Sequence, residues 1–205
     1  RQDASRPASP VESLGPIGLF WAISRHGDRL AYSERLQTVS IWRIDLAGGK
    51  RTSRIVKSSG QEFNPEIAPD GKRIAFVSNR SGRNQVWISA SDGAHAIELA
   101  NTPSPHPAPA RWSPDGNQVV YECQNEGNDD VCIVSARGGS ARQFTRDPAR
   151  DSLPSWSRDG QWIYFVHGLG LGQMGAWRIR SSGGTPERLT RDATVTFLAP
   201  LDSRT

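Results

Sequence analysis

The sequence predicts an all-β chain that contains four copies of one four-stranded antiparallel unit. Three observations support this prediction: a glycine turn precedes an apolar run four times, a Trp or Cys column recurs every 45 residues in a second apolar run, and another glycine turn follows each second run. Self-similarity at this period is typical of a repeat architecture. The first turn glycines, spaced by 44, 45 and 44 residues, are Gly27, Gly71, Gly116 and Gly160.

Each copy is expected to form four short strands, which we call A to D. Strand A precedes the Asp-Gly turn, whose residues tolerate the positive φ angles of tight hairpins. Strand B is the apolar run after the turn, and a polar loop leads from it to strand C. Strand D follows the second glycine turn and is more polar, as expected for an outer edge strand. The column that marks strand C consists of Trp42, Trp87, Cys132 and Trp177.

Strands B and C are almost continuously apolar, which indicates that neighbouring sheets cover both of their faces. Sheets that stack radially in this way form a β-propeller, with about 40–45 residues per blade. We therefore predict one propeller domain over residues 1–205, with blades near 18–55, 62–99, 107–144 and 152–189.

Both ends of the chain break inside a repeat. Residues 5–14 match a strand D without the rest of its blade, and residues 194–200 match the start of a further strand A. Four complete blades can close into a small ring, whereas the broken ends favour an arc cut from a larger ring.

The composition argues against several classes of protein. The 205-residue chain has a formal net charge of +4, and its basic residues, mostly Arg, are scattered rather than clustered as on a nucleic-acid surface. No apolar run approaches the roughly 18 residues that a membrane-spanning helix needs. A GxGxxG match at residues 170–175 precedes a strand, where a nucleotide site needs a helix, so no cofactor is expected.

The two cysteines belong to the third copy, with Cys123 at the end of strand B and Cys132 in strand C. Partners in an antiparallel hairpin have sequence numbers of constant sum, so these residues could face each other and form a disulfide. Two buried free thiols are the favoured alternative. A disulfide would indicate an oxidising compartment such as the periplasm, and the choice between periplasm and cytoplasm stays open.

One set of residues is a candidate binding site. Strand A of each blade lines the central channel of a propeller, and equivalent strand A positions carry Glu66, Arg111 and Ser155. Glu66 and Arg111 are expected to meet across adjacent blades, either as a structural ion pair or as part of a polar funnel for a ligand. The apolar residues that follow, expected in the core between blades, are Ile23, Ile67, Trp112 and Trp156.

No catalytic or metal site is predicted from residue spacing. Asp129 and Asp130 are expected to be solvated in a loop, and the four histidines have no Cys, His or Glu partner at zinc spacing. No G-x-S-x-G elbow or Ser–His–Asp set can be argued from the sequence. We therefore expect a chain that is not an enzyme.

Four segments carry a recurring motif, namely Trp112-Ser113-Pro114-Asp115-Gly116, Trp156-Ser157-Arg158-Asp159-Gly160, Ser78-Asn79-Arg80-Ser81-Gly82 and Gly183–Thr190. Together they resemble the WD40-like PD40 repeat of TolB-type propellers. The resemblance implies three settings. These are a periplasmic envelope protein that docks other proteins, an interaction module of a bacterial winged-helix regulator or a kinase, and the propeller that gates prolyl-oligopeptidase-type serine peptidases. The Arg-rich repeats look most like the regulator-attached kind.

We therefore expect a non-catalytic propeller that binds a protein or peptide, within a bacterial regulatory or TolB-like envelope protein. Loops on a rigid scaffold commonly carry such recognition. The alternative is the gating propeller of a serine peptidase whose catalytic domain is absent from this chain. A small ligand in the channel is a third hypothesis, and neither direct nucleic-acid contact nor a membrane span is expected.

Overall fold

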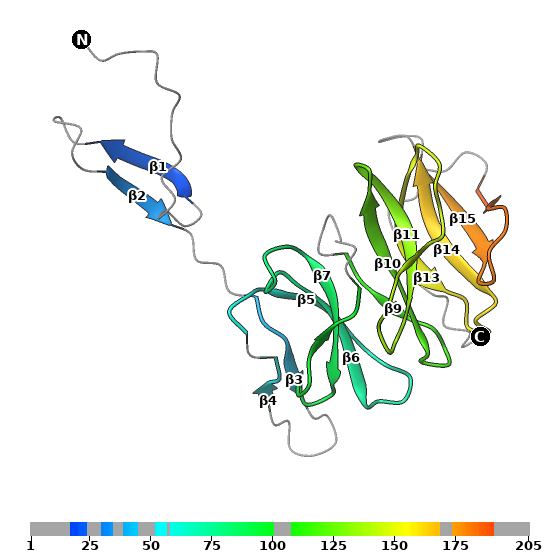
Figure 1. Ribbon diagram of the computed structural model, residues 1–205, viewed down its shortest axis with the longest axis horizontal. Helices are drawn as coiled ribbons and strands as arrows, with labels where there is room; N and C mark the ends of the chain where they lie inside the picture. Colours follow the sequence, from blue (N-terminus) through cyan, green and yellow to red (C-terminus); the bar gives the residue numbers. More distant parts are fainter. Residues whose placement is uncertain are drawn as a thin grey trace, which may run out of the picture. The chain divides into compact units, whose positions relative to one another are not determined.

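The computed structural model describes residues 17–23, 30–34, 39–44, 52–56, 58–100, 108–168 and 174–190. Every regular element in these ranges is a strand, every pairing is antiparallel, and the predicted all-β class is confirmed (Figure 1). The same ranges contain no helix that could cross a membrane. The strands predicted within 5–14 and 194–200 lie outside the described residues.

The chain forms two compact units, residues 1–38 and 39–205. In the first unit, β1 (Ile17–Ile23) and β2 (Leu30–Glu34) form an antiparallel hairpin. The second unit begins with another two-stranded sheet, formed by β3 (Trp42–Ile44) and β4 (Thr52–Arg54). These four strands lie in the sequence range of the first predicted blade.

The rest of the second unit consists of three four-stranded sheets, in each of which the strands lie side by side in chain order. The first contains β5 (Glu62–Ile67), β6 (Arg73–Ser78), β7 (Gln85–Ala90) and β8 (Ile97–Glu98). The second contains β9 (Arg111–Trp112), β10 (Gln118–Asn125), β11 (Asn128–Ser135) and β12 (Arg142–Gln143). The third contains β13 (Arg150–Trp156), β14 (Trp162–Gly168), β15 (Gly175–Arg180) and β16 (Glu187–Arg188).

The Asp-Gly turns join the first two strands of each four-stranded sheet in the same way. In the second sheet, the Ser113 N–H bonds the Gln118 carbonyl at 2.9 Å, and Gly116 adopts a φ of 68°. The Asp115 carboxylate accepts hydrogen bonds from the Ser113 hydroxyl at 2.6 Å and the Asn117 N–H at 3.0 Å. The turn therefore depends on Gly for its backbone and on Asp for its internal hydrogen bonds.

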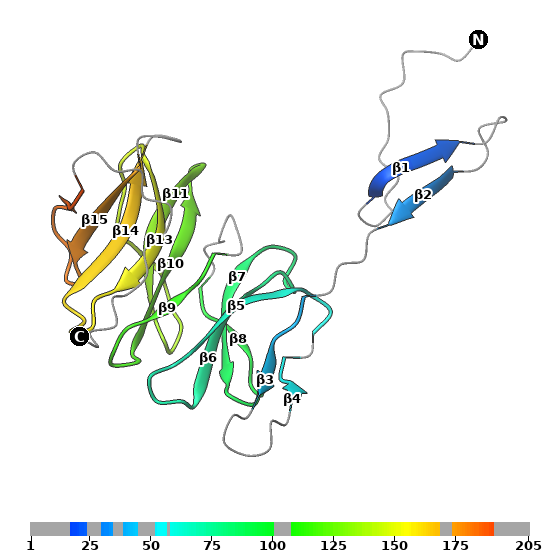
Figure 2. The ribbon, with the colours of Figure 1, turned by 180° about the vertical axis from the view of Figure 1, so that it is seen from behind.

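Alternate residues of β6 pack against different neighbouring sheets, which explains its continuous apolar run. Ile74 and Phe76 belong to a core cluster with residues that flank β3 and β4. Ala75 and Val77 belong to a cluster with residues of the second four-stranded sheet. The second and third four-stranded sheets share another cluster, and β11 lies beside β13 in both ribbon views (Figures 1 and 2).

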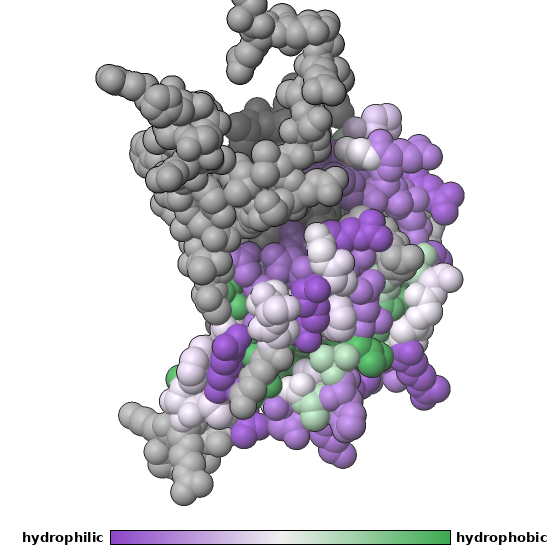
Figure 3. All heavy atoms as spheres, turned by 60° about the vertical axis from the view of Figure 1, so that its left-hand side comes forward, coloured by the Kyte–Doolittle hydropathy of each residue, from purple (hydrophilic) through white to green (hydrophobic). Residues whose placement is uncertain are grey.

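One face of the described residues is mostly polar. On the face seen in Figure 3, hydrophilic residues dominate and the hydrophobic residues form small patches. The large hydrophobic side chains that stay exposed include Trp42, Ile44, Ile67, Ile97 and Leu189.

Two tryptophans connect the first strands of consecutive sheets. The Trp112 Nε1–H donates to the Glu66 carbonyl on β5 at 3.1 Å, and the Trp156 Nε1–H donates to the Arg111 carbonyl on β9 at 3.2 Å. Both side chains are buried, as the sequence predicts. Ile67 occupies the equivalent position in the first four-stranded sheet but is 63% exposed, contrary to expectation, and it has no indole N–H with which to form this bond.

We expect Trp156→Phe to lower the free energy of unfolding by about 1–2 kcal/mol, because the Arg111 carbonyl would lose its buried donor while most of the ring is kept. Urea denaturation of the purified chain measures this change. Trp42→Phe is the matched control, and since Trp42 is 58% exposed its effect should stay within about 0.5 kcal/mol. Equal effects of the two substitutions would contradict the role of the indole bond.

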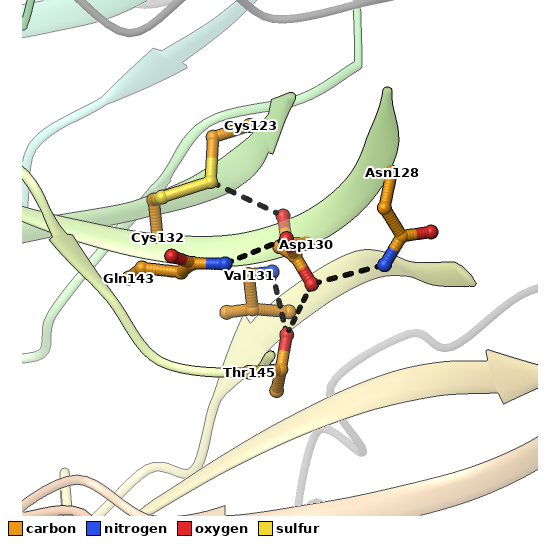
Figure 4. The surroundings of a disulfide bond; sticks show 7 residues. All are labelled: Cys123, Asn128, Asp130, Val131, Cys132, Gln143 and Thr145. Carbon is orange, nitrogen blue, oxygen red and sulfur yellow. Dashed lines mark hydrogen bonds between the residues drawn. A yellow bond between two sulfur atoms is a disulfide. The ribbon is translucent and has the colours of Figure 1, made fainter. Parts of the chain in front are cut away.

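Cys123 and Cys132 form a disulfide between β10 and β11, so the favoured alternative of two free thiols is wrong (Figure 4). The two residues are not directly opposite each other, because Cys132 pairs with Tyr121 and Cys123 pairs with Asp130. The hairpin closes through Glu126 and Gly127, both with positive φ, and this two-residue turn sets the register. The disulfide therefore links diagonal neighbours, whose Cα atoms are 5.8 Å apart.

Replacing both cysteines with Ala should lower the free energy of unfolding by about 2–3 kcal/mol, as expected for a crosslink that closes a loop of roughly ten residues. Urea denaturation of the double variant and of the wild type, each with and without reductant, measures the effect. Reductant should destabilise the wild type alone. A double variant as stable as the oxidised wild type would refute this contribution.

Candidate functional site

The first strands of two of the four-stranded sheets contain a bulge that determines which side chains face each other. In β5 and β13 the register shifts between Phe63 and Glu66 and between Ser152 and Ser155. Asn64 and Leu153, with φ angles of 47° and 52°, lie at these bulges. A non-glycine residue in this region is strained, and bulges commonly re-aim neighbouring side chains.

Glu66 and Arg111, predicted to meet across adjacent blades, are brought together by the structure. The Arg111 Nη1 lies 3.7 Å from the Glu66 Oε2, and both side chains are about 30% exposed. The tryptophan bonds described above hold the backbone at both positions, since their acceptors are the carbonyls of these same two residues. The pair is therefore partly accessible and has a fixed backbone.

Ser155, the third predicted residue, lies on β13 and is only 6% exposed. Among the residues that the structure describes, it forms no ion pair or hydrogen bond with Glu66 or Arg111. The accessible part of the predicted set is thus the Glu66–Arg111 pair.

The Glu66 carboxylate is held at some energetic cost. Partial burial raises its pKa, although the nearby Arg111 charge and the Trp112 backbone act in the opposite direction. Because the net pKa shift is upward, ionised Glu66 is less favourable in the folded chain than in the unfolded chain. A stabilising effect on the fold therefore does not explain why this position carries a carboxylate.

The substitution Glu66→Gln tests the direction of this pKa shift through the pH dependence of the free energy of unfolding. A raised folded-state pKa means that the contribution of Glu66 to stability decreases as pH rises through that pKa, whereas Gln does not titrate. The free energy of unfolding of the variant, relative to wild type, should therefore increase between about pH 4 and about pH 7, by less than about 1 kcal/mol. Urea titrations at both pH values measure it, and a relative decrease would mean that the ion pair stabilises the fold.

A second cluster of ionisable groups lies where the second and third four-stranded sheets meet. His167, at the end of β14, has its Nδ1 2.7 Å from the Asp151 Oδ1 and 3.7 Å from the Asp147 Oδ1. One potential ligand atom from each of these three residues lies within 4.8 Å of the other two. The His167 ring also packs against Trp177, with a centroid distance of 4.6 Å.

The bulge at Leu153 creates this contact. Trp156 pairs with Ile163, and the same register continued along β13 would place Gly168 opposite Asp151. The bulge shifts the pairing by one residue, so that His167 faces Asp151 instead. The histidine–carboxylate contact therefore follows from the bulge.

Burial determines the electrostatics of the cluster. It raises the pKa of Asp151 to about 6, and the Asp147 charge adds to this rise, while the nearby Thr145 hydroxyl and the His167 imidazole oppose it. Burial also raises the pKa of Asp130. The side chain of Asp130 accepts hydrogen bonds from Gln143, Thr145 and Asn128 (Figure 4).

Sequence reasoning missed this cluster. Asp129 and Asp130 both lie on β11, so the expectation of a solvated loop is wrong. Asp130 is 2% exposed, and Asp129 forms a 2.7 Å ion pair with Arg150. His167 has a carboxylate partner 16 residues away, because the hairpin brings them together. Short spacings do not report such a cross-strand pair, and the bulge that sets its register is not visible in the repeat.

Comparison with known proteins identifies the family. The profile of the TolB β-propeller domain, PD40, matches residues 96–201, just over half of the chain. The chain belongs to the TolB β-propeller family. The Tol-Pal system protein TolB of Bordetella pertussis is 32% identical over 138 residues, which cover 67% of this chain and 32% of that relative. The chain thus spans about a third of the length of this relative.

Solved structures share the fold of this chain. A TolB-type protein from Agrobacterium tumefaciens has a TM-score of 0.66 and 25% identity, over 83% of this chain and 61% of its own. TolB from Acinetobacter baumannii has a TM-score of 0.64 and 22% identity, over 85% and 43% of the two chains. Peptidase propellers match less well, as in prolyl oligopeptidase B from Galerina marginata, with a TM-score of 0.55 and 13% identity over 83% and 29%.

Proposed function

We propose that this chain is a non-catalytic, protein-binding propeller module of a bacterial cell-envelope protein. The observation that carries the proposal is the match to the TolB propeller family over more than half of the chain. The Bordetella relative is named as a protein of the Tol-Pal system, and we propose that this chain serves a comparable protein-binding role. Because a fold hosts many functions, this analogy needs support from features of the chain itself.

The disulfide supports the envelope setting. Disulfides persist in the periplasm and are rare in the reducing cytosol. Cys123 and Cys132 are both buried and bonded to each other. This favours a periplasmic module over a cytoplasmic module attached to a winged-helix regulator, although the Arg-rich repeats resemble the latter.

The Glu66–Arg111 pair is the part of the surface that we propose for partner contact. An acid and a base that are each about 30% exposed offer an acceptor and a bidentate donor to a peptide. The backbone under both residues is fixed by the tryptophan bonds, so little ordering is needed on binding. Ser155 lies at the equivalent position of the next sheet, on β13, but it is only 6% exposed and is left out of the proposed contact.

The second candidate function, a peptidase-gating propeller, has less support. The peptidase propellers resemble this chain less closely than TolB structures do, both in TM-score and in identity. Identities this low support a shared fold only.

The test is a quantitative capture experiment with the purified chain as bait. Periplasmic and cytoplasmic extracts of the encoding bacterium are passed over wild type and Arg111→Ala, and bound proteins are quantified by mass spectrometry. We expect a periplasmic protein that wild type retains and whose affinity, measured afterwards with the purified partner, falls at least about tenfold in Arg111→Ala.

Arg178→Ala is the matched control, because Arg178 also forms an ion pair, with Glu187, and is exposed to nearly the same degree as Arg111. The control should bind the partner like wild type. If both variants lose partner affinity equally, the proposed contact is refuted. If the chain retains cytoplasmic proteins alone, the proposed periplasmic setting is refuted.

A further inference from the structure

The cluster around Asp151 contains more negative charge than the protein compensates. The Asp151 side chain is completely buried, and its Oδ2 has no hydrogen-bond partner in the structure. Asp130 is also buried, and Asp147 is 41% exposed. In the described part of the chain, none of these three carboxylates pairs with Lys or Arg, and Arg150 is bound to Glu122 and Asp129 instead.

In another blade, the protein itself supplies a positive charge beside the equivalent buried acid. Counted from the turn glycines Gly71 and Gly160, Glu62 corresponds to Asp151 and Ser78 to His167. Glu62 is also buried and follows the same pattern of a bulged first strand, but its Oε1 lies 3.3 Å from the Arg80 Nη2. A permanent cation therefore accompanies the buried acid in that blade. In the blade of Asp151, the sequence has Leu169 where Arg80 would be.

We propose that Asp147, Asp151 and His167 bind a divalent transition-metal ion, with Zn²⁺ as the best-fitting candidate. An imidazole with two carboxylates is a donor set that suits Zn²⁺ and related ions, whereas Ca²⁺ and Mg²⁺ prefer oxygen ligands alone. The ion would supply the positive charge that Arg80 supplies in the other blade, and the unpartnered Oδ2 would gain a ligand contact.

The geometry requires only small adjustments. Donors at about 2 Å from one ion lie roughly 3–4 Å apart, and the three donors here lie within 4.8 Å of one another. The direct contact between the His167 Nδ1 and the Asp151 Oδ1 would open as the ion enters. Water would fill the remaining coordination position, since the protein offers three ligands.

Isothermal titration of the full chain with ZnCl₂, MnCl₂ and CaCl₂ tests the proposal. We expect one Zn²⁺ per chain and a higher melting temperature with Zn²⁺. His167→Ser, which installs the residue of the equivalent blade, and Asp147→Asn should each weaken Zn²⁺ binding at least about tenfold. Asp147 is partly exposed, so its variant should fold even where a change at His167 does not.

His95→Ser is the matched control, because His95 lies exposed in the glycine turn between β7 and β8, away from the cluster. It should bind Zn²⁺ like wild type. Absence of Zn²⁺ binding by wild type, or unchanged affinity in Asp147→Asn, would overturn the proposal. Tighter binding of Ca²⁺ than of Zn²⁺ would overturn the assignment of the metal class. None of these outcomes depends on the partner binding proposed above.

Discussion

The hydrogen bond from a tryptophan indole to a backbone carbonyl one sheet away is the interaction on which the arrangement of sheets depends. A buried indole N–H needs an acceptor, and a carbonyl on the innermost strand lacks a neighbour on its free edge. Trp112 with Glu66 and Trp156 with Arg111 satisfy both needs at once. Apolar packing between the sheets is not directional, whereas this bond fixes how far each first strand lies along its neighbour.

That constraint also places the candidate binding pair. The residues whose carbonyls accept the indole bonds are Glu66 and Arg111, so their side chains occupy matching positions on neighbouring strands. The repeat made the contact between Glu66 and Arg111 predictable from sequence, since equivalent positions of adjacent blades lie side by side. The degree of exposure was not predictable, because Ile67 and Trp112 occupy one column but differ in burial.

Register is the property that the repeat does not reveal. The columns locate β10 and β11, but the two-residue turn at Glu126 and Gly127 decides that Cys123 and Cys132 are diagonal neighbours. The Asp-Gly turn likewise locates β13 and β14, but the bulge at Leu153 decides that His167 faces Asp151. A shift of one residue changes every cross-strand pair, and no composition or spacing rule reports it.

The bulge removes an acid from water in two blades, and the residues around that acid decide how its charge is compensated. Both bulged strands bring an acidic residue opposite the end of the second strand, where it is removed from water. A buried carboxylate requires a cation or a proton. Glu62 has Arg80, a cation that belongs to the chain. Asp151 has a histidine and a second carboxylate instead of an arginine, and the metal ion proposed above would supply the cation from solution.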